Sequence, residues 1–358
     1  MYFTMDDLLR ELVKEKGSDL HIRVGEPPFF RIHGHITRAK NFPVLSQEKA
    51  KELLYSILSK ERQRKFEKTF ELDMSYTIPD LARFRVNIFQ QSNCIGAALR
   101  LIPIRIETID ELKLPQVFKQ LAMLQRGFIL VTGPTGSGKS TTLAAMIEHI
   151  NTNKKGNIIT IEDPIEFVHT DKLCTINQRE VGVDALSFAD ALKHVMRQNP
   201  DVILVGEMRD LETISSAITA AETGVLVFAT VHTNTAVQTI DRIIDVFPIE
   251  QQEQVRLQLA VNLQAIVSQT IIPRADGQGR VVAFEIMIAI PAIRSLIREG
   301  KAHQMYTIIQ SSGGYGMRTL DSDLLELVKN KLVTYDEALA RAPNPKEFEQ
   351  RATRMQAV

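Results

Sequence analysis

The stretch GFILVTGPTGSGKST, residues 127–141, decides the fold. Phe128–Val131 is an apolar run with the length of a buried strand, and Ser140–Ile150 carries a helical pattern. The glycine-rich loop between them matches G-x-x-x-x-G-K-S, a loop in which backbone N–H groups and a helix N-terminus converge on a polyphosphate. The stretch therefore predicts a phosphate-binding loop between a strand and a helix of an α/β domain.

The side chains of this loop have distinct expected roles. Lys139 would reach the β- and γ-phosphates of a nucleotide, and Ser140 would ligate Mg²⁺. ATP and Mg²⁺ are therefore the expected cofactors. The expected nucleotide-binding residues are Gly133, Pro134, Thr135, Gly136, Ser137, Gly138, Lys139, Ser140 and Thr141.

The sequence around this loop alternates between two patterns. From Phe118 to Arg274, short apolar runs alternate with helical segments, among them a helix expected over Gln251–Thr270. Such alternation predicts βαβ units and a buried, mostly parallel sheet.

Three polar side chains follow apolar runs of this sheet. Glu207 ends DVILVGE (201–207), Glu166 ends IEDPIE (161–166) after a strand, and His232 follows GVLVFATV (224–231). Parallel strands place their carboxyl ends at one edge, where ligands bind, so we expect the three side chains near that edge. Glu207 would also be a Mg²⁺ ligand and position water. A solvated loop glutamate, a helix cap and a structural histidine are the ordinary alternatives for these residue types.

The remaining chain divides by pattern into further regions. Residues 1–102 predict a small α+β domain, with a helix over Met5–Lys16, strand patterns in DLHIRV and PFFRIHGHI, and a helix capped by Ser46. Residues 103–115 contain two prolines and are the expected linker or hinge. Residues 116–290 are the expected core of the second domain, and residues 291–358 are expected to be helical.

Composition excludes several classes of protein. The 358 residues suffice for two domains, and 43 Lys and Arg balance 43 Asp and Glu, which counts against a nucleic-acid partner. Cys94 and Cys174 are isolated, so neither a disulfide framework nor a zinc site is indicated. We find no basic leader before an apolar segment and no apolar run of about 20 residues, so we expect a cytoplasmic protein without direct membrane insertion.

Four motifs in order resemble the Walker A, Asp-box, Walker B and His-box series of the secretion/pilus ATPases. They are GPTGSGKST (133–141), IITIEDPIE (158–166), RQNPDVILVGEMRD (197–210) and TVHTNTAVQTIDRIIDVFP (230–248). AIRSLIREG (292–300) further resembles an element of the pilus-retraction members of that family. The tetracysteine zinc subdomain common in the assembly members has no counterpart among two cysteines.

This resemblance implies a PAS-like N-terminal domain, a RecA-like P-loop ATPase domain with C-terminal helices, and a ring of six identical chains. By the same resemblance Glu207 would bind Mg²⁺ and water, Glu166 would be a second catalytic carboxylate, and His232 would sense the γ-phosphate. Arg85 and Arg100 match the positions of arginine fingers. The implied activity is Mg-dependent ATP hydrolysis that powers type IV pilus retraction.

The implied location is the cytoplasmic side of the inner membrane at the pilus base, beside a PilC-like platform protein. Three alternatives stay open at this point. The chain could be a pilus-assembly or type II secretion ATPase of the same family. It could be a nucleotide-gated regulatory protein without motor activity, or a DNA-translocating RecA-type motor, against which the balanced charge counts.

Overall fold

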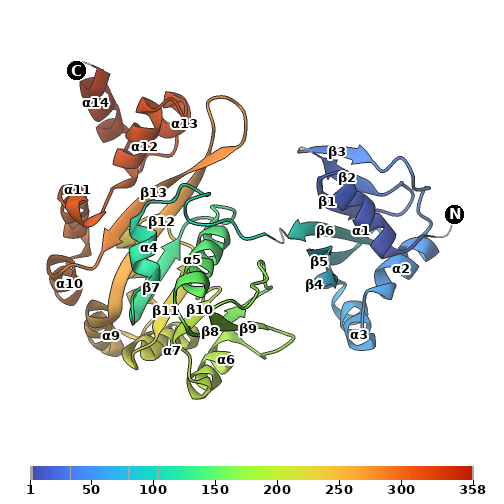
Figure 1. Cartoon of the computed structure of the whole chain (residues 1–358), viewed down its shortest axis with the longest axis horizontal. Helices are drawn as coiled ribbons and strands as arrows, with labels where there is room; N and C mark the ends of the chain where they lie inside the picture. The colour runs from blue at the N-terminus through green and yellow to red at the C-terminus, as the bar shows by residue number, and fades with distance from the viewer. Residues whose placement is uncertain (1–2, 33, 80, 103–104, 357–358) are drawn as a thin grey trace. The chain divides into compact units, whose positions relative to one another are not determined.

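The computed structural model describes residues 3–32, 34–79, 81–102 and 105–356. The chain forms two compact units. The N-terminal unit contains residues 1–105 and 164–168, and the C-terminal unit contains residues 106–163 and 169–358 (Figure 1). Residues 103 and 104 of the expected linker lie outside the described residues.

The N-terminal unit is built on a six-stranded antiparallel sheet with strand order β3-β2-β1-β6-β5-β4. The strands are β1 (Gly17–Ile22), β2 (Phe29–Ile32), β3 (His35–Arg38), β4 (Glu71–Ile78), β5 (Ala82–Gln91) and β6 (Cys94–Ile102). The helices are α1 (Met5–Lys14), α2 (Gln47–Ser56) and α3 (Lys60–Thr69).

Side-chain caps fix the starts of these helices. Thr4 and Asp7 form a reciprocal capping box at α1, and Ser46 caps α2 as the sequence predicts. Leu8, Leu9 and Leu12 on one face of α1 are fully buried and pack into the core of this unit. The helix expected over Met5–Lys16 is confirmed, two residues shorter, and the segment PFFRIHGHI supplies two antiparallel strands.

The C-terminal unit contains a seven-stranded sheet with strand order β13-β12-β7-β11-β10-β8-β9. The strands are β7 (Gly127–Thr132), β8 (Gly156–Glu162), β9 (Cys174–Glu180), β10 (Val202–Val205), β11 (Leu226–Val231), β12 (Leu263–Pro273) and β13 (Arg280–Ile288). All neighbours pair in parallel except β12 and β13, so the expectation of a mostly parallel sheet is confirmed.

Helices cover both faces of this sheet, which explains why its inner strands β7, β10 and β11 are buried along their whole length. Side chains of α4 and α5 pack on one face, and those of α6 to α11 on the other. The helices are α4 (Val117–Ala122), α5 (Lys139–Asn153), α6 (Phe188–Val195), α7 (Leu211–Glu222), α8 (Ala236–Asp245), α9 (Ile249–Asn262), α10 (Pro291–Arg298) and α11 (Met305–Ser311). Within the described ranges, short 3₁₀ helices span Met196–Gln198, Ala302–Gln304 and Gly313–Tyr315.

The helix expected over Gln251–Thr270 is wrong in its second half. Helix α9 ends at Asn262, and β12 begins at Leu263 between β7 and β13. Three β-branched residues, Thr270 to Ile272, precede Pro273, and such side chains favour a strand. Two neighbouring strands supply backbone partners to β12, and this pairing outweighs the helical pattern.

The described residues of the C-terminal region form helices joined by turns and short loops, with an isolated β-bridge from Arg318 to Ile286. The region continues with α12 (Leu320–Lys329), α13 (Tyr335–Leu339) and α14 (Pro345–Gln356), which share a small core with the ends of β12 and β13. None of the helices in the described ranges is long and apolar enough to cross a membrane.

Candidate nucleotide site

The glycine-rich loop connects β7 to α5 through backbone conformations that glycine favours. Gly133, Gly136 and Gly138 have φ values of +140°, +78° and +88°. A Cβ at Gly133 would lie 2.3 Å from the backbone oxygen of Gln269. The loop can therefore wrap this tightly only with glycine at position 133.

Lys139 is the first residue of α5, and its side chain binds the backbone of the loop. Its buried Nζ donates to the backbone oxygens of Gly133 at 2.8 Å and Pro134 at 3.1 Å. Within the described residues no side chain caps the N-terminus of α5, so its first N–H groups and the positive end of its dipole face the loop. Positive charge and backbone donors thus gather at one point, which favours a polyphosphate.

Two residues that the sequence reading placed in a helix support this loop from β12. Gln269 Nε2 donates to the backbone oxygen of Ser137 at 2.6 Å, and the hydroxyls of Thr132 and Ser268 lie 2.8 Å apart. Ser137 Oγ and Gln269 Oε1 are buried without a hydrogen-bond partner among the described residues. Such buried, unpaired polar atoms beside the loop fit a site that binds a polar ligand.

Glu207 and His232 meet at the ends of two neighbouring strands. The backbone hydrogen bond from Met208 N to Thr230 O, at 3.0 Å, ties the segment after β10 to β11. His232 Nε2 lies 2.9 Å from Glu207 Oε1, and Arg209 Nη2 donates to Glu207 Oε2 at 2.7 Å. The Glu207 carboxylate therefore has a fixed orientation, and Arg209 is a partner that the sequence reading missed.

A cavity of about 590 Å³ joins these side chains to the glycine-rich loop. Thr135 of the loop, Glu207, Arg209, His232 and Arg242 contribute to its lining. The structure thus brings together the loop and two of the three strand-end residues that the sequence singled out.

Glu166 follows the end of β8 by four residues. Strand β8 ends at Glu162, and residues 164–168 group with the N-terminal unit rather than with the sheet that carries Glu207. There the Glu166 carboxylate is 3.5 Å from Arg85 Nη1, and both side chains are nearly half exposed. Glu166 thus lies beyond the end of β8, and its expected place at the sheet edge beside Glu207 and His232 stays a prediction.

Arg85 and Arg100 lie opposite each other on neighbouring strands of the N-terminal unit. The register pairs Arg85 with Arg100, Arg100 with Asp19, and Asp19 with Arg31, which places three arginines in one row across the sheet. Arg100 Nε donates to Asp19 Oδ1 at 2.9 Å, and Arg31 Nε lies 3.4 Å from Asp19 Oδ2. This row carries an excess of positive charge, which suits an anion.

Asp19 is the acidic member of this row. Burial opposes its ionisation, but hydrogen bonds from Arg100 and Ser18 and the charges of Arg100 and Arg31 outweigh burial, so its pKa lies below the usual value. Asp19 is thus a charged, buried partner for two arginines.

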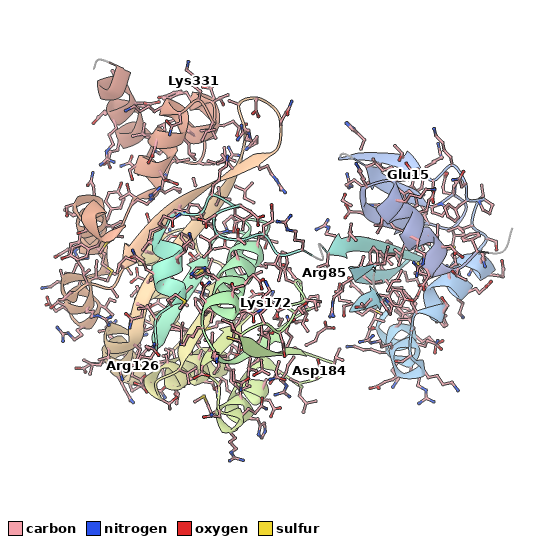
Figure 2. The ribbon with its side chains drawn as sticks, viewed as in Figure 1. Glu15, Arg85, Arg126, Lys172, Asp184 and Lys331 are labelled. Atoms are coloured by element: carbon pink, nitrogen blue, oxygen red, sulfur yellow. The ribbon has the colours of Figure 1, made fainter. Side chains whose placement is uncertain are left out.

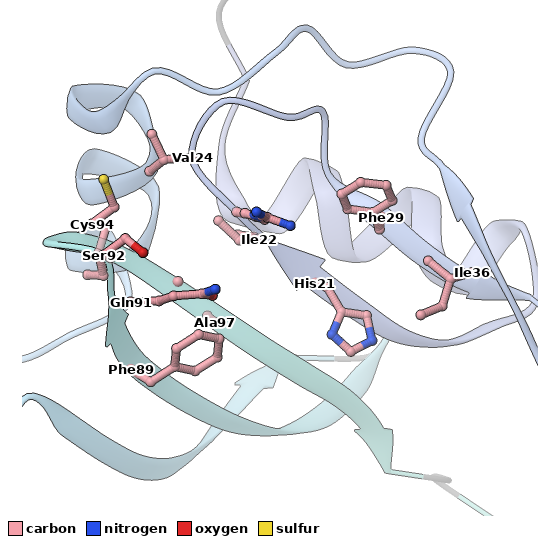
Figure 3. A pocket seen from close by; sticks show the side chains of 13 residues that line it. His21, Ile22, Val24, Phe29, Ile36, Phe89, Gln91, Ser92, Cys94 and Ala97 are labelled. Carbon is pink, nitrogen blue, oxygen red and sulfur yellow. The ribbon is translucent and has the colours of Figure 1, made fainter.

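The N-terminal unit also has a hollow of about 400 Å³ at the turn between β5 and β6 (Figure 3). His21, Phe29, Ile36, Phe89 and Cys94 are among the residues that line it. Aromatic and aliphatic side chains predominate there, and the sequence reading gave no indication of it.

The donor set near the loop is compatible with Mg²⁺. Ser140 offers a hydroxyl in the first turn of α5, and Glu207 offers a carboxylate, both hard oxygen ligands. No group of three or more His, Cys, Asp or Glu residues in the described ranges could hold a metal on its own. Mg²⁺ often binds through one or two protein oxygens together with nucleotide phosphates, so this donor set fits it.

The parallel sheet, the glycine-rich loop and the carboxylate at a neighbouring strand end define a P-loop nucleotide-binding protein of the RecA-like type. The family described as type II/IV secretion system protein matches residues 2–340, and the chain belongs to this family. The resemblance noted in the four motifs is thereby confirmed, as is the expected fold class.

Individual relatives extend over nearly the whole chain. The type IV pilus retraction ATPase PilT of Pseudomonas aeruginosa is 50% identical over 342 residues, which cover 96% of this chain and 99% of that protein. The type IV pilus ATPase PilU of the same organism is 42% identical and covers 96% of this chain and 90% of its own. The crystal structure of the pilus retraction motor PilT with bound ADP has a TM-score of 0.92 at 47% identity, covering 98% of this chain and 100% of that one.

Proposed function

We propose that this protein is a Mg-dependent ATPase that powers retraction of type IV pili. The observation that carries the proposal is the joining of the glycine-rich loop, Glu207 and His232 at one cavity. The sequence identity of 50% with a type IV pilus retraction ATPase, over 96% of this chain, supports the same function.

In this proposal each part of the site has one task. Lys139 and the loop amides hold the phosphates, and Ser140 and Glu207 hold Mg²⁺, which would neutralise charge on the phosphates. Glu207, fixed by His232 and Arg209, orients the attacking water. Glu166 supplies a second carboxylate, and Arg85 and Arg100 compensate charge that develops on the transferred phosphoryl group.

The proposed assembly is a homohexamer that works in the cytoplasm beside an inner-membrane platform protein of the PilC type. Family membership and the extensive identity with a pilus retraction ATPase support this assembly. No direct membrane insertion is needed, since the platform protein would provide the attachment.

The variant Glu207→Gln tests the chemistry. Gln keeps the size of the side chain but lacks the negative charge, so it cannot act as a base and is a weaker Mg²⁺ ligand. Because Lys139 and the loop amides hold the phosphates, we expect ATP to bind with near wild-type affinity. Phosphate release should fall by about 100-fold or more. The measurement is steady-state phosphate release with and without Mg²⁺, together with binding of a fluorescent ATP analogue. Wild-type turnover in this variant would remove Glu207 from the mechanism, and a wild-type protein that releases no phosphate would favour a regulatory protein.

A gene deletion in cells distinguishes a retraction motor from an assembly motor. Cells that lack the gene should carry many pili that do not retract, and complementation with wild type should restore twitching, whereas Glu207→Gln should not. Cells without pili would instead identify an assembly motor. Normal pilus numbers with partial loss of retraction would identify an accessory role in retraction.

A further inference from the structure

Gln178, in the middle of edge strand β9, bridges the two ends of the loop at residues 163–168. Its Nε2 donates to Glu162 Oε1 at 3.1 Å, just before the loop. Its Oε1 accepts a hydrogen bond from the backbone N–H of His169 at 2.8 Å, just after the loop. One side-chain amide therefore closes the base of the loop.

Both ends that Gln178 joins are fixed in turn. Thr160 Oγ1 donates to Glu162 Oε1 at 2.7 Å, which orients the carboxylate that Gln178 binds. Beyond His169, the fully buried Asn151 of α5 accepts from Lys172 N at 3.1 Å and donates to Thr170 O at 2.8 Å. The base of the loop is thus anchored to β8 and to the helix that begins at Lys139 (Lys172 is labelled in Figure 2).

The apex of the loop carries Glu166. Residues 164–168 group with the N-terminal unit, where Glu166 approaches Arg85 to 3.5 Å and Ile165 is buried. This ion pair is nearly half exposed and is weak by itself. The base of the loop therefore acts together with the contacts of residues 164–168 in the N-terminal unit to set the position of Glu166.

We propose that Gln178 is a positioning residue for Glu166, and this inference rests on the proposed role of Glu166 in ATP hydrolysis. Closing the base restricts the conformations of the loop, and small displacements of a catalytic group lower the rate strongly. Gln178 acts through the loop and has no assigned contact with nucleotide.

An amide of this length meets both requirements. The side chain must donate to a carboxylate and accept from a backbone N–H at the same time, which Gln does and Glu does not. Glu at position 178 would place two carboxylates together, and Asn is one methylene shorter. The preferred variants are therefore Gln178→Ala and Gln178→Glu, the second of which keeps the size of the side chain within β9.

The first test measures hydrogen exchange in the full-length protein. In Gln178→Ala and Gln178→Glu, the backbone amides of residues 163 and 165–169 should exchange at least about tenfold faster than in wild type, whereas those of α5 should not change. Asn177→Ala is the matched control, because Asn177 is an amide on the same strand, is exposed and bonds Asn157 instead. Unchanged exchange in the loop in both Gln178 variants would overturn the inference, even if one of them folds poorly.

The second test measures phosphate release in a double-mutant cycle. Gln178→Ala and Gln178→Glu should each lower kcat by about tenfold with little change in KM, and Asn177→Ala should lower neither. In the Glu166→Gln background, followed under single-turnover conditions so that slow rates are measurable, the Gln178 change should have no further effect.

Each result that contradicts the inference has its own meaning. A further tenfold loss in the Glu166→Gln background would show that Gln178 acts by another route and would overturn the inference. A Glu166→Gln variant with wild-type kcat would overturn it as well, by removing the group that Gln178 is proposed to position. Failure of the proposed function would look different, because the wild-type protein would then release no phosphate.

Discussion

At the scale of single residues, the charge balance of the N-terminal unit depends on Asp19. Its carboxylate is buried, while Arg100, which it binds, is 73% exposed. The ion pair is therefore asymmetric: water can solvate the arginine, but the aspartate depends on its protein partners. Three positive charges in one row would repel each other more strongly without it.

Asp19→Asn should destabilise the N-terminal unit by about 1–2 kcal/mol at neutral pH, because it removes charged hydrogen bonds from two arginines. The pKa of Asp19 is lowered in the folded state, so its stabilisation is present above its unfolded pKa of about 4 and is lost as pH falls through the lower folded value. The difference between variant and wild type should therefore shrink below about pH 4.

Urea unfolding at several pH values measures this difference. Asp73→Asn is the matched control, since Asp73 is exposed on β4 of the same sheet and accepts a hydrogen bond from Asn87 rather than from an arginine. A stability difference for Asp19→Asn that stayed constant from pH 7 to pH 3 would show that the charge of Asp19 is not its source.

The site residues were predictable from sequence to different degrees. Gly133, Lys139 and Ser140 belong to one contiguous motif whose backbone requirements can be read directly. Gln269 and Gln178 could not be found this way, because their partners lie on strands far away in sequence. An ordinary glutamine in a strand carries no local signal of the groups that it will bind.

At the scale of elements, Arg294 shows why two arginines of the AIRSLIREG segment are not equivalent. Arg294 Nη1 donates to the backbone oxygens of Ala260 at 2.6 Å and Val261 at 2.7 Å, in the last turn of α9. Arg298, one turn later in α10, is exposed. Arg294 thus caps α9 just before the chain enters β12.

Arg294→Ala should lower the free energy of unfolding by about 1–3 kcal/mol, because the last carbonyls of α9 lose a charged donor. Arg298→Ala, an exposed position on the same helix, should change stability by no more than about 0.5 kcal/mol. Chemical denaturation of both purified variants measures this contrast. Equal effects would mean that loss of side-chain packing on α10, rather than the cap on α9, determines the result.

The elements themselves were predicted well where the sequence pattern agrees with tertiary pairing. Parallel strands such as β7 and β11 are buried along their whole length because helices cover both faces, and their apolar runs show this in the sequence. Strand β12 was missed because it follows α9 without an intervening turn. What makes it a strand is the pair of neighbours β7 and β13, which only the fold supplies.

At the scale of the whole molecule, the chain crosses between its two units more than once. The first boundary between the units falls between residues 105 and 106. Later in the chain, residues 164–168 belong to the N-terminal unit, although the residues on both sides of them belong to the C-terminal unit. The first crossing was expected from the proline-bounded segment at residues 103–115, whereas the second had no signal in composition.

We propose that ATP binding changes the arrangement of the two units, with residues 103–115 as the hinge, since only differential affinity for two arrangements can drive motion.

Fluorescence transfer between two engineered cysteines tests this motion. Cys94 and Cys174 are first replaced by serine, and Glu15→Cys and Arg126→Cys then place one exposed label in each unit (Figure 2). In a Glu207→Gln background, which should hold ATP without hydrolysing it, adding Mg-ATP should change the transfer efficiency, and ADP should change it less. Labelled chains are diluted into unlabelled ones so that transfer within a single chain is measured.

The control pair is Arg126→Cys with Lys331→Cys, because both positions are exposed and lie in the C-terminal unit (Figure 2). Its transfer efficiency should not depend on nucleotide if the unit moves as one body. A change in both pairs would point to rearrangement inside the C-terminal unit. If neither pair responds to ATP although ATP is bound, the energy of binding does not move the units, and a hinge at residues 103–115 has no role in the cycle. A response confined to the pair that spans the units would tie nucleotide binding to their relative motion, which a retraction motor requires.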